Sequence, residues 1–334
     1  MSSAAMVDII IVTWKTRDLT CRCVENVIEK TSNEAISAHI YVVDNYSQDG
    51  TVSTLRSQYP DITVIENNRN AGFSVANNIA IRCSKAPFLL LLNSDAFLKN
   101  NCLTRLLSTI KSDPVTGAVG PRLVLPSGAV QHSVTQITSP WSQLGYLLAF
   151  HFPPLSQKLK KLFHKNRDTL VLGTAPRHVP LLSAACLLVR REVFDKVGLL
   201  PEDRFLYSEE DDLFFRMKKA GYRSIYLPSA EALHICGESS SKNVETVRND
   251  DHFSRSRLKF LFQHYPQYRF FTFITHIFFY SWSCCVCKLK TMLRDSETDK
   301  IYYANARLLV SIVLAEYRLA RDSKIQYRQS STIK

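Results

Sequence analysis

Short apolar runs alternate with longer stretches of mixed polarity in the first third of the chain. The runs are rich in β-branched residues and predict buried strands at Val7–Val12, Ile40–Val43, Thr63–Ile65 and Phe88–Leu92. The stretches between them have helical length and lie at Arg17–Lys30, from Asp49 onward, at Ser74–Cys83 and at Leu98–Ile110. This alternation predicts an α/β fold built from βαβ units around a parallel sheet.

Polar or glycine residues follow each of the predicted strands. They are Thr13-Trp14-Lys15, Asp44-Asn45, Asn67 to Gly72 and Asn93-Ser94-Asp95. Ligands of open α/β sheets bind beyond the carboxyl ends of the strands, so we expect these four segments to converge on one binding edge. Turn formation alone explains any single one of them equally well. The chain contains neither GxGxxG nor GxxxxGK[ST], which argues against dinucleotide and P-loop sites.

Two later segments combine apolar bulk with positive charge. Leu155–Lys165 alternates leucines with lysines and predicts a basic amphipathic helix, for which a solvated helix face is the alternative. Phe270–Cys287 is aromatic and apolar and is flanked by Arg269, Lys288 and Lys290. Its 18 residues are at the short limit for a bilayer span, so docking at a membrane interface is expected ahead of spanning. A buried core helix is the other alternative.

Composition and charge describe a folded, basic protein. The 334 residues are 46% apolar and 22% charged, which is the usual globular balance. The formal charge is +12, and residues 242–334 hold 16 basic against 8 acidic side chains. This excess favours an anionic partner, but the aromatic residues there do not interleave with the cations, so we expect no nucleic acid. The nine cysteines do not include two CxxC motifs that could pair, so neither a disulfide framework nor a zinc site is predicted. The N-terminus lacks a signal pattern, and a cytoplasmic protein is therefore expected.

Asp95 and His234 are candidate ligands for a divalent cation. Asp95 follows the run Phe88–Leu92, and a carboxylate at a strand end can hold a hard cation that neutralises phosphate oxygens. One acid makes an incomplete site, which needs phosphates or other side chains. His234 follows an apolar turn expected at Tyr226-Leu227-Pro228, and a lone histidine is usually structural. The glycine, serines and Lys242 that come after it have phosphate-binding capacity.

Four consecutive acids, Glu209 to Asp212, begin a predicted helix. Ser208 and Asp211 have the spacing of a capping box, and acids in a first turn complement the helix dipole. A cap needs one or two acids rather than four. Crowded carboxylates raise one another's pKa values, as a general base requires, so the run is also a candidate catalytic site.

Taken in order, these segments resemble the inverting family 2 glycosyltransferases, and among them the bacterial rhamnosyltransferase-like branch. The match extends from about Met6 to Lys242. It consists of the segments Val43 to Gly50, Asn70 to Phe73 with Asn77 and Asn78, Asn93 to Asp95, Leu188 to Gly198, and Glu209 to Arg216. The chain departs from the family pattern at Thr13, Ala76 and Ala184, where the family usually has an asparagine and two glycines. These departures leave the nucleotide and the acceptor open.

The resemblance implies a nucleotide-diphospho-sugar transferase (GT-A, Rossmann-like) fold, in which a mixed sheet has helices on both faces. The catalytic domain would occupy residues 1–242, with a nucleotide-sugar half of about 1–125 and an acceptor half of 126–242. Residues 243–334 would form a basic, aromatic-rich helical region that associates with an anionic membrane surface at the inner face of the membrane.

The implied activity is inverting transfer of a sugar from dTDP-rhamnose or a UDP-sugar to a hydroxyl of a lipid-linked glycan, in cell-surface polysaccharide synthesis. Asp95 with His234 would hold Mg²⁺ or Mn²⁺, and Glu210 would be the general base, with Glu209 as the alternative. The predicted donor-binding residues are Thr13, Asp44, Asn45, Arg69, Gly72, Asn77, Asn93, Ser94 and Lys242. A membrane-bound scaffold that has lost catalysis is the competing hypothesis, and the intact acids and His234 argue against it.

Overall fold

The computed structural model describes residues 6–151, 173–235, 245–294 and 297–331. The chain divides into two compact units. The first, the sheet unit, comprises Met1–Ile137 and Lys165–Lys242, and the second, the helical unit, comprises Thr138–His164 and Asn243–Lys334. The helical unit therefore takes in a segment from the middle of the chain as well as the region after residue 242.

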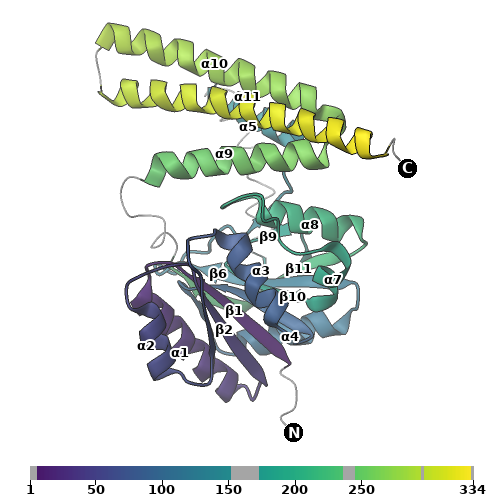
Figure 1. Ribbon diagram of the computed structural model, residues 1–334. Helices are drawn as coiled ribbons and strands as arrows, with labels where there is room; N and C mark the ends of the chain where they lie inside the picture. Colours follow the sequence, from purple (N-terminus) through teal and green to yellow (C-terminus); the bar gives the residue numbers. More distant parts are fainter. Residues whose placement is uncertain (1–5, 152–172, 236–244, 295–296, 332–334) are drawn as a thin grey trace. The chain divides into compact units, whose positions relative to one another are not determined.

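A nine-stranded mixed sheet forms the centre of the sheet unit (Figure 1). Its order is β3-β2-β1-β4-β10-β6-β11-β5, with β8 paired to β11. The strands are β1 (Val7–Thr13), β2 (Ala38–Asp44), β3 (Thr63–Glu66), β4 (Phe88–Asn93), β5 (Ala96–Leu98), β6 (Thr116–Val124), β8 (Arg177–His178), β10 (Cys186–Arg190) and β11 (Arg223–His234). The first four strands pair in parallel, whereas β10 is antiparallel to β4 and β6. Two short strands, β7 (Val134–Thr135) and β9 (Leu181–Leu182), form a separate antiparallel pair.

Helices cover both faces of this sheet, as expected. Successive strand residues point to opposite faces, so Ile9 and Ile10 of β1 belong to different core clusters. The cluster around Ile9 draws on α1 (Arg17–Asn33), α2 (Thr51–Gln58) and α4 (Cys102–Ser112). The cluster around Ile10 draws on α3 (Phe73–Cys83), α7 (Arg191–Val197) and α8 (Glu209–Lys219). The sheet is therefore buried on both sides, which leaves its strand ends as the place for polar chemistry.

Two details of the sequence prediction are wrong. The helix expected from Leu98 begins only at Cys102, because Ala96–Leu98 forms β5 and pairs with the end of β11. The turn expected at Tyr226-Leu227-Pro228 lies instead within β11. A break in the β11–β6 register between Leu227 and Glu231 accommodates the proline, which cannot donate a ladder hydrogen bond.

The helical unit consists of α5 (Pro140–His151), α9 (Glu245–His264), a short 3₁₀ turn η1 (Pro266–Tyr268), α10 (Arg269–Arg294) and α11 (Glu297–Ser331). The two longest helices, α10 and α11, lie side by side (Figure 1). Leu258, Phe262, Ile312 and Val313 form the centre of the core of this unit. By length and composition, Pro266–Leu293 could cross a membrane, and only 17% of its apolar window is buried in the protein. The predicted helix Leu155–Lys165 lies outside the described residues.

Candidate active site

The four polar segments after β1 to β4 meet at one edge of the sheet, as the sequence predicts. Thr13 and Asp44 are paired in the β1–β2 register. The N–H of Asn67 donates to the carbonyl of Asp44 at 2.9 Å. The hydroxyl of Ser94, after β4, lies 3.2 Å from that of Thr16, after β1. These contacts join all four loops into one surface.

Five of the predicted donor-binding residues have buried side chains, namely Thr13, Asp44, Asn45, Asn77 and Ser94. In Thr13 and Asn77 the side chain has a hydrogen-bond partner nearby in the chain. Thr13 is 1% exposed, and its hydroxyl lies 2.6 Å from that of Thr20. Asn77 is also 1% exposed, and its amide donates to the carbonyl of Phe73 in the same helix at 2.9 Å. Both side chains therefore stabilise the loops and the helix from within, and their contact with a donor stays a prediction.

The two carboxylate oxygens of Asp44 differ in their hydrogen bonding. Its Oδ2 accepts the N–H of Ser47 at 3.0 Å, whereas the buried Oδ1 has no hydrogen-bond partner among the described residues. The neighbouring loops hold Lys15, Tyr46 and Gln48 at φ of 56°, 68° and 55°. Such left-handed backbone costs a non-glycine residue roughly 1–3 kcal/mol and is typical of functional sites. The Oδ1 atom is therefore an acceptor suited to a ligand N–H or O–H.

Asn45 organises the loop that follows β3. Its Oδ1 accepts the side-chain N–H of Asn67 and the backbone N–H of Ala71, each at 3.0 Å. Its Nδ2 donates to Asn70 Oδ1 at 2.9 Å. Because both ends of the amide are engaged, Asn45 shapes the donor side of the edge through the loop.

Gly72 joins this loop to the segment that precedes the acidic helix. Its φ of +85° is in the left-handed region, and a Cβ placed there would lie 2.2 Å from the carbonyl oxygen of Phe205. The next residue, Phe73, donates its N–H to that oxygen at 3.1 Å. Only glycine permits this approach, so the glycine is explained by packing.

Asp95 and His234 face each other at the end of β4. Asp95 Oδ1 lies 3.3 Å from His234 Nε2, and both residues are buried. His234 Nδ1 lies 2.8 Å from Gln131 Oε1, an amide oxygen that can only accept, so the Nδ1 carries hydrogen. In the neutral ring the Nε2 lone pair then faces the carboxylate. In that form of the ring, its Nε2 and the carboxylate oxygen are both acceptors.

This pair fits two ligand positions of a divalent cation. Two atoms that each lie about 2.1 Å from an octahedral ion at right angles are about 3 Å apart, close to the observed separation. Within the described ranges, no group of three or more histidine, cysteine or acidic side chains could hold a metal ion. The remaining ligands would be phosphate oxygens and water, as is usual for Mg²⁺.

The acids at the start of α8 have different environments. Buried Asp212 accepts from Arg216 Nε at 2.6 Å, and Arg216 also donates to the carbonyl of Leu199 at 2.8 Å. This pair anchors the helix to the preceding loop. The predicted capping box is wrong: Ser208 is the N-cap, but its φ of 62° is left-handed and its side chain makes no cap hydrogen bond. A capping serine needs an extended backbone.

Glu209 and Glu210 both have raised pKa values but different contacts. Burial raises the pKa of Glu209 well above its ordinary value, and the neighbouring Glu210 charge adds to this effect. Glu209 Oε2 is buried and has no hydrogen-bond partner among the described residues. Burial also raises the pKa of half-buried Glu210, whose Oε1 accepts the N–H of Ala184 at 3.1 Å. Glu210 is thus the acid tied to the sheet edge.

One loop links Glu210 to the turn that carries Asp95. Ala184 donates its N–H to Glu210, and the carbonyl of the next residue, Ala185, accepts the N–H of Asn93 at 3.0 Å. In the sequence, Ala184 stands out only as a departure from the family pattern. Gln131, which orients His234, belongs to no motif and could not be found from the sequence.

Two of the predicted donor-binding residues are cations, Arg69 and Lys242. Arg69 is exposed on the loop after β3. Lys242 lies outside the described residues. Both assignments remain predictions.

Comparison with known proteins agrees with this geometry. The family model described as glycosyl transferase family 2 matches residues 8–198, more than half of the chain. The chain belongs to glycosyl transferase family 2. The matched family 2 region contains the loops after β1 to β4, Asp95 and the Ala184–Ala185 segment, and it ends before Glu209 and His234.

Several glycosyltransferases are similar to this family 2 chain. It is 30% identical over 215 residues to the N-acetylglucosaminyl-diphospho-decaprenol L-rhamnosyltransferase of Mycobacterium tuberculosis, an alignment that covers 61% of this chain and 68% of the relative. It is 26% identical over 233 residues to the low-salt glycan biosynthesis hexosyltransferase Agl10 of Haloferax volcanii, covering 68% and 66%. Mannosyltransferase PcManGT from Pyrobaculum calidifontis, solved with GDP-Man and Mn²⁺, has a TM-score of 0.53 at 15% identity over 94% of this chain and 88% of its own. That structural likeness shows the fold.

Proposed function

We propose that this family 2 glycosyltransferase transfers a sugar from dTDP-rhamnose or a UDP-sugar to a hydroxyl of a lipid-linked glycan, with inversion at the anomeric carbon. The observation that carries the proposal is the single loop, Ala184–Ala185, that is bonded both to Glu210 and to the Asp95 turn. Glu210 and the turn of Asp95 are thereby held at one sheet edge, where they would serve as the proton acceptor and the phosphate-side group. The relative whose name specifies a diphospho-decaprenol acceptor and rhamnosyl transfer supports the acceptor and donor classes.

The donor side of the site would be formed by the loops after β1 to β4. Asp44 Oδ1, which has no partner among the described residues, would accept a hydrogen bond from the nucleoside. Asn45 would act by holding the Asn67–Ala71 loop in place. Arg69 and Ser94 would lie near the phosphates, where a guanidinium and a hydroxyl suit anionic oxygens.

Asp95 and His234 would hold Mg²⁺ or Mn²⁺, and their facing acceptor atoms support this assignment. When bound, the cation would neutralise the negative charge that develops on the diphosphate leaving group. Gln131 would keep the His234 ring in the required tautomer and orientation, as partners behind metal-bound histidines do. The similar mannosyltransferase of Pyrobaculum calidifontis was also solved with Mn²⁺.

Glu210 would be the general base. Its carboxylate would take the proton of the acceptor hydroxyl while that oxygen forms a bond to the anomeric carbon. The bond from that carbon to the diphosphate oxygen would break on the opposite face, and the nucleoside diphosphate would leave. The hydrogen bond from Ala184 fixes the Glu210 carboxylate, so that attack occurs from one direction.

The helical unit would bring the enzyme to the inner face of an anionic membrane. Phe270, Ile274, Phe278 and Trp282 of α10 are exposed at intervals of four residues, so they form an apolar stripe along one side of the helix. Lys288 and Lys290 are exposed in the same helix, after the last residue of the stripe. An exposed apolar stripe with cations at its end suits a helix docked at a lipid surface.

Donor binding tests the proposal at its first step. The full chain with Mn²⁺ should gain thermal stability when dTDP-rhamnose or a UDP-sugar is added, because a ligand at 100 times its dissociation constant stabilises by about 2.7 kcal/mol. Asp44→Asn should weaken the shift, and Glu29→Gln, an exposed change away from the sheet edge, should not. A panel of nucleotide sugars that gives no shift would contradict the proposed donor class.

A further inference from the structure

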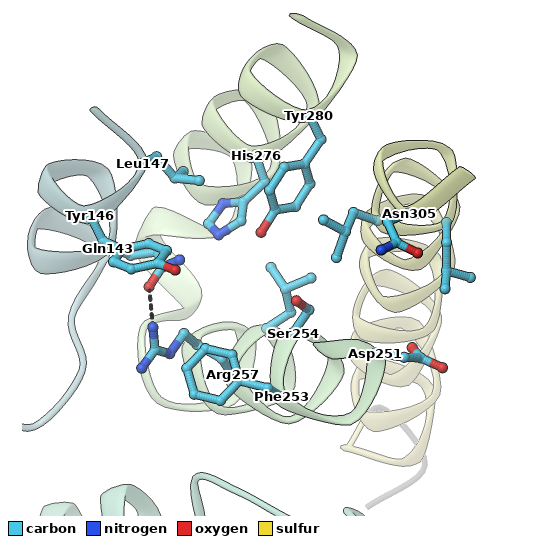
Figure 2. Close-up of a pocket in the computed structure, with 13 residues that line it drawn as sticks. Gln143, Tyr146, Leu147, Asp251, Phe253, Ser254, Arg257, His276, Tyr280 and Asn305 are labelled. Atoms are coloured by element: carbon cyan, nitrogen blue, oxygen red, sulfur yellow. Dashed lines mark hydrogen bonds between the residues drawn. The ribbon is translucent and has the colours of Figure 1, made fainter. Parts of the chain in front are cut away.

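A cavity of about 210 Å³ lies inside the helical unit, where α5, α9, α10 and α11 meet. Figure 2 shows the polar side chains around it. They include Gln143, Ser254, Arg257, His276, Tyr280 and Asn305. Asp251, whose carboxylate accepts from Arg255 Nε at 2.6 Å, also lines the cavity, and leucine and aromatic side chains form the rest of the wall. Burying polar groups in the interior of a helical unit costs stability unless hydrogen bonds compensate, so their gathering around one space indicates a polar ligand.

His276 contributes an acceptor to this cavity. The residue is 2% exposed, and its Nδ1 lies 2.7 Å from the carbonyl of Thr272, to which it donates. Burial lowers the pKa of His276 to about 4, and the positive charge of Arg257 contributes to the same effect. The ring is therefore neutral at pH 7, and its Nε2 is a hydrogen-bond acceptor. Figure 2 shows the ring beside the Tyr280 phenol, across the cavity from α9.

Arg257 is fixed at the wall before any ligand arrives. Its Nη1 donates to Gln143 Oε1 at 3.1 Å, which joins α9 to α5. The guanidinium also lies 4.1 Å from the ring centroid of Phe253 and 5.9 Å from that of Tyr146. A side chain already held by such contacts loses little conformational entropy when it binds a ligand.

We propose that this cavity binds the phosphate group of a lipid. Arg257 presents the planar N–H groups that match phosphate oxygens, and Ser254 and Asn305 add neutral donors. The acceptor Nε2 of His276 suits a hydroxyl on or beside the phosphate. The cavity is smaller than the roughly 300–1,000 Å³ of sites that enclose whole drug-sized ligands. It therefore fits a headgroup, with the hydrocarbon chain outside.

A membrane supplies the ligand, which is the one respect in which this inference rests on the proposed function. The α10 helix that carries His276 and Tyr280 also carries the exposed apolar stripe. Phosphate joined to a hydrocarbon chain occurs both in a polyprenyl-phosphate acceptor and in a glycerophospholipid. The chemistry of the cavity is common to the two sources, and the probes below separate them.

Binding of short, soluble lipids to the full chain tests the inference. The probes are farnesyl phosphate, dihexanoylphosphatidylglycerol and the uncharged alcohol farnesol, each titrated by calorimetry. A phosphate-bearing probe should bind at least tenfold more tightly than farnesol. If farnesyl phosphate binds more tightly than dihexanoylphosphatidylglycerol, the ligand of the cavity is the polyprenyl-phosphate acceptor. If the phosphatidylglycerol binds more tightly, the ligand is a membrane glycerophospholipid. Equal binding of farnesol and both phosphates would overturn the inference.

Variants locate the binding in the cavity. Arg257→Gln should weaken phosphate-lipid binding at least tenfold, whereas Arg318→Gln, an exposed change of equal charge on α11, should not. Ser254→Leu should fill the cavity while it keeps Arg257, and lipid binding should therefore fall. This variant tests the inference even if Arg257→Gln does not fold. Unchanged affinity in Ser254→Leu would overturn the inference. Nucleotide-sugar binding to the same samples distinguishes the two proposals, because donor binding that persists without lipid binding contradicts only this one.

Discussion

Gly72 lies directly against the carbonyl of Phe205, so the donor-side loop and the segment before the acidic helix are in contact through backbone atoms. Tyr207 and Ser208, which follow Phe205, have φ of 73° and 62°. The segment that precedes Glu209 and Glu210 therefore has a strained backbone, and it packs against Gly72. The proposed donor loop and the proposed base are therefore linked through this contact.

Gly72→Ala should reduce activity more than the removal of a surface contact would. At φ 85° and ψ 174° Gly72 is in a backbone region almost confined to glycine, where a residue with a Cβ costs about 1–3 kcal/mol. The added methyl group would also collide with the Phe205 oxygen. The loop should shift and carry Glu210 with it. The measurement is the transfer rate together with the free energy of unfolding. Gly128→Ala is the matched control, since Gly128 also has positive φ but has open space around its Cβ position. A fully active Gly72→Ala variant would contradict the link.

Glu209→Gln should stabilise the protein at neutral and alkaline pH. The raised pKa means that the folded state keeps a proton that the unfolded chain releases above the ordinary value of 4.5. Wild-type stability therefore falls as pH rises from 4.5 through the raised pKa. Glutamine is neutral throughout and removes this loss. A rise of one in a pKa corresponds to about 1.4 kcal/mol, so a gain of at least that size is expected at pH 8 by urea unfolding. Below pH 4 the two proteins should be equally stable, and a gain that persists there would point to packing instead.

Gln131→Leu should weaken activation by Mn²⁺ without removing a ligand. Loss of the partner that orients a metal-bound histidine lowers metal affinity by about 10- to 100-fold. The variant should therefore reach wild-type activity only at higher Mn²⁺, whereas Asp95→Asn should stay inactive across the titration. Wild-type activity in excess EDTA would contradict metal dependence.

Lys288→Glu with Lys290→Glu should release the protein from anionic vesicles. Each basic residue near such a surface contributes about 1 kcal/mol, so loss of the two cations should lower the partition coefficient about 30-fold at low salt, and the introduced carboxylates should lower it further. Lys85→Glu with Lys111→Glu changes the charge equally on exposed residues of the sheet unit and is the control. Co-sedimentation that is the same for both double variants would contradict docking through α10.

The sequence predicted most of the sheet edge because its signals are local. Apolar runs give strands, and parallel strands bring their carboxyl ends together, so the convergence of Thr13, Asp44 and Ser94 follows from pattern alone. The short strand β5 was missed because its pairing with β11 joins residues far apart in the chain. No local pattern carries that information.

The roles of individual side chains were less predictable. Asn45 and Gly72 stand in a family motif, but their contacts show packing roles that depend on partners elsewhere in the chain. The four acids are equivalent in the sequence, and only burial and the partners Arg216 and Ala184 separate them. Gln131 has no distinguishing neighbours in the sequence, and its role follows solely from the folded position of His234.

The rate of sugar transfer by Glu210→Gln tests the central claim most directly. The assay uses Mn²⁺, the nucleotide sugar that gives the thermal shift and a lipid-linked acceptor, at several pH values. Because burial raises the pKa of Glu210, the wild-type rate should begin to fall on acidification above the ordinary glutamate value and level off at higher pH. A general base contributes about 10²–10⁴-fold, so Glu210→Gln should lose that factor and the pH dependence while donor binding is unchanged. Glu209→Gln should retain most of the rate. Wild-type turnover in Glu210→Gln, or a greater loss in Glu209→Gln, would contradict the account.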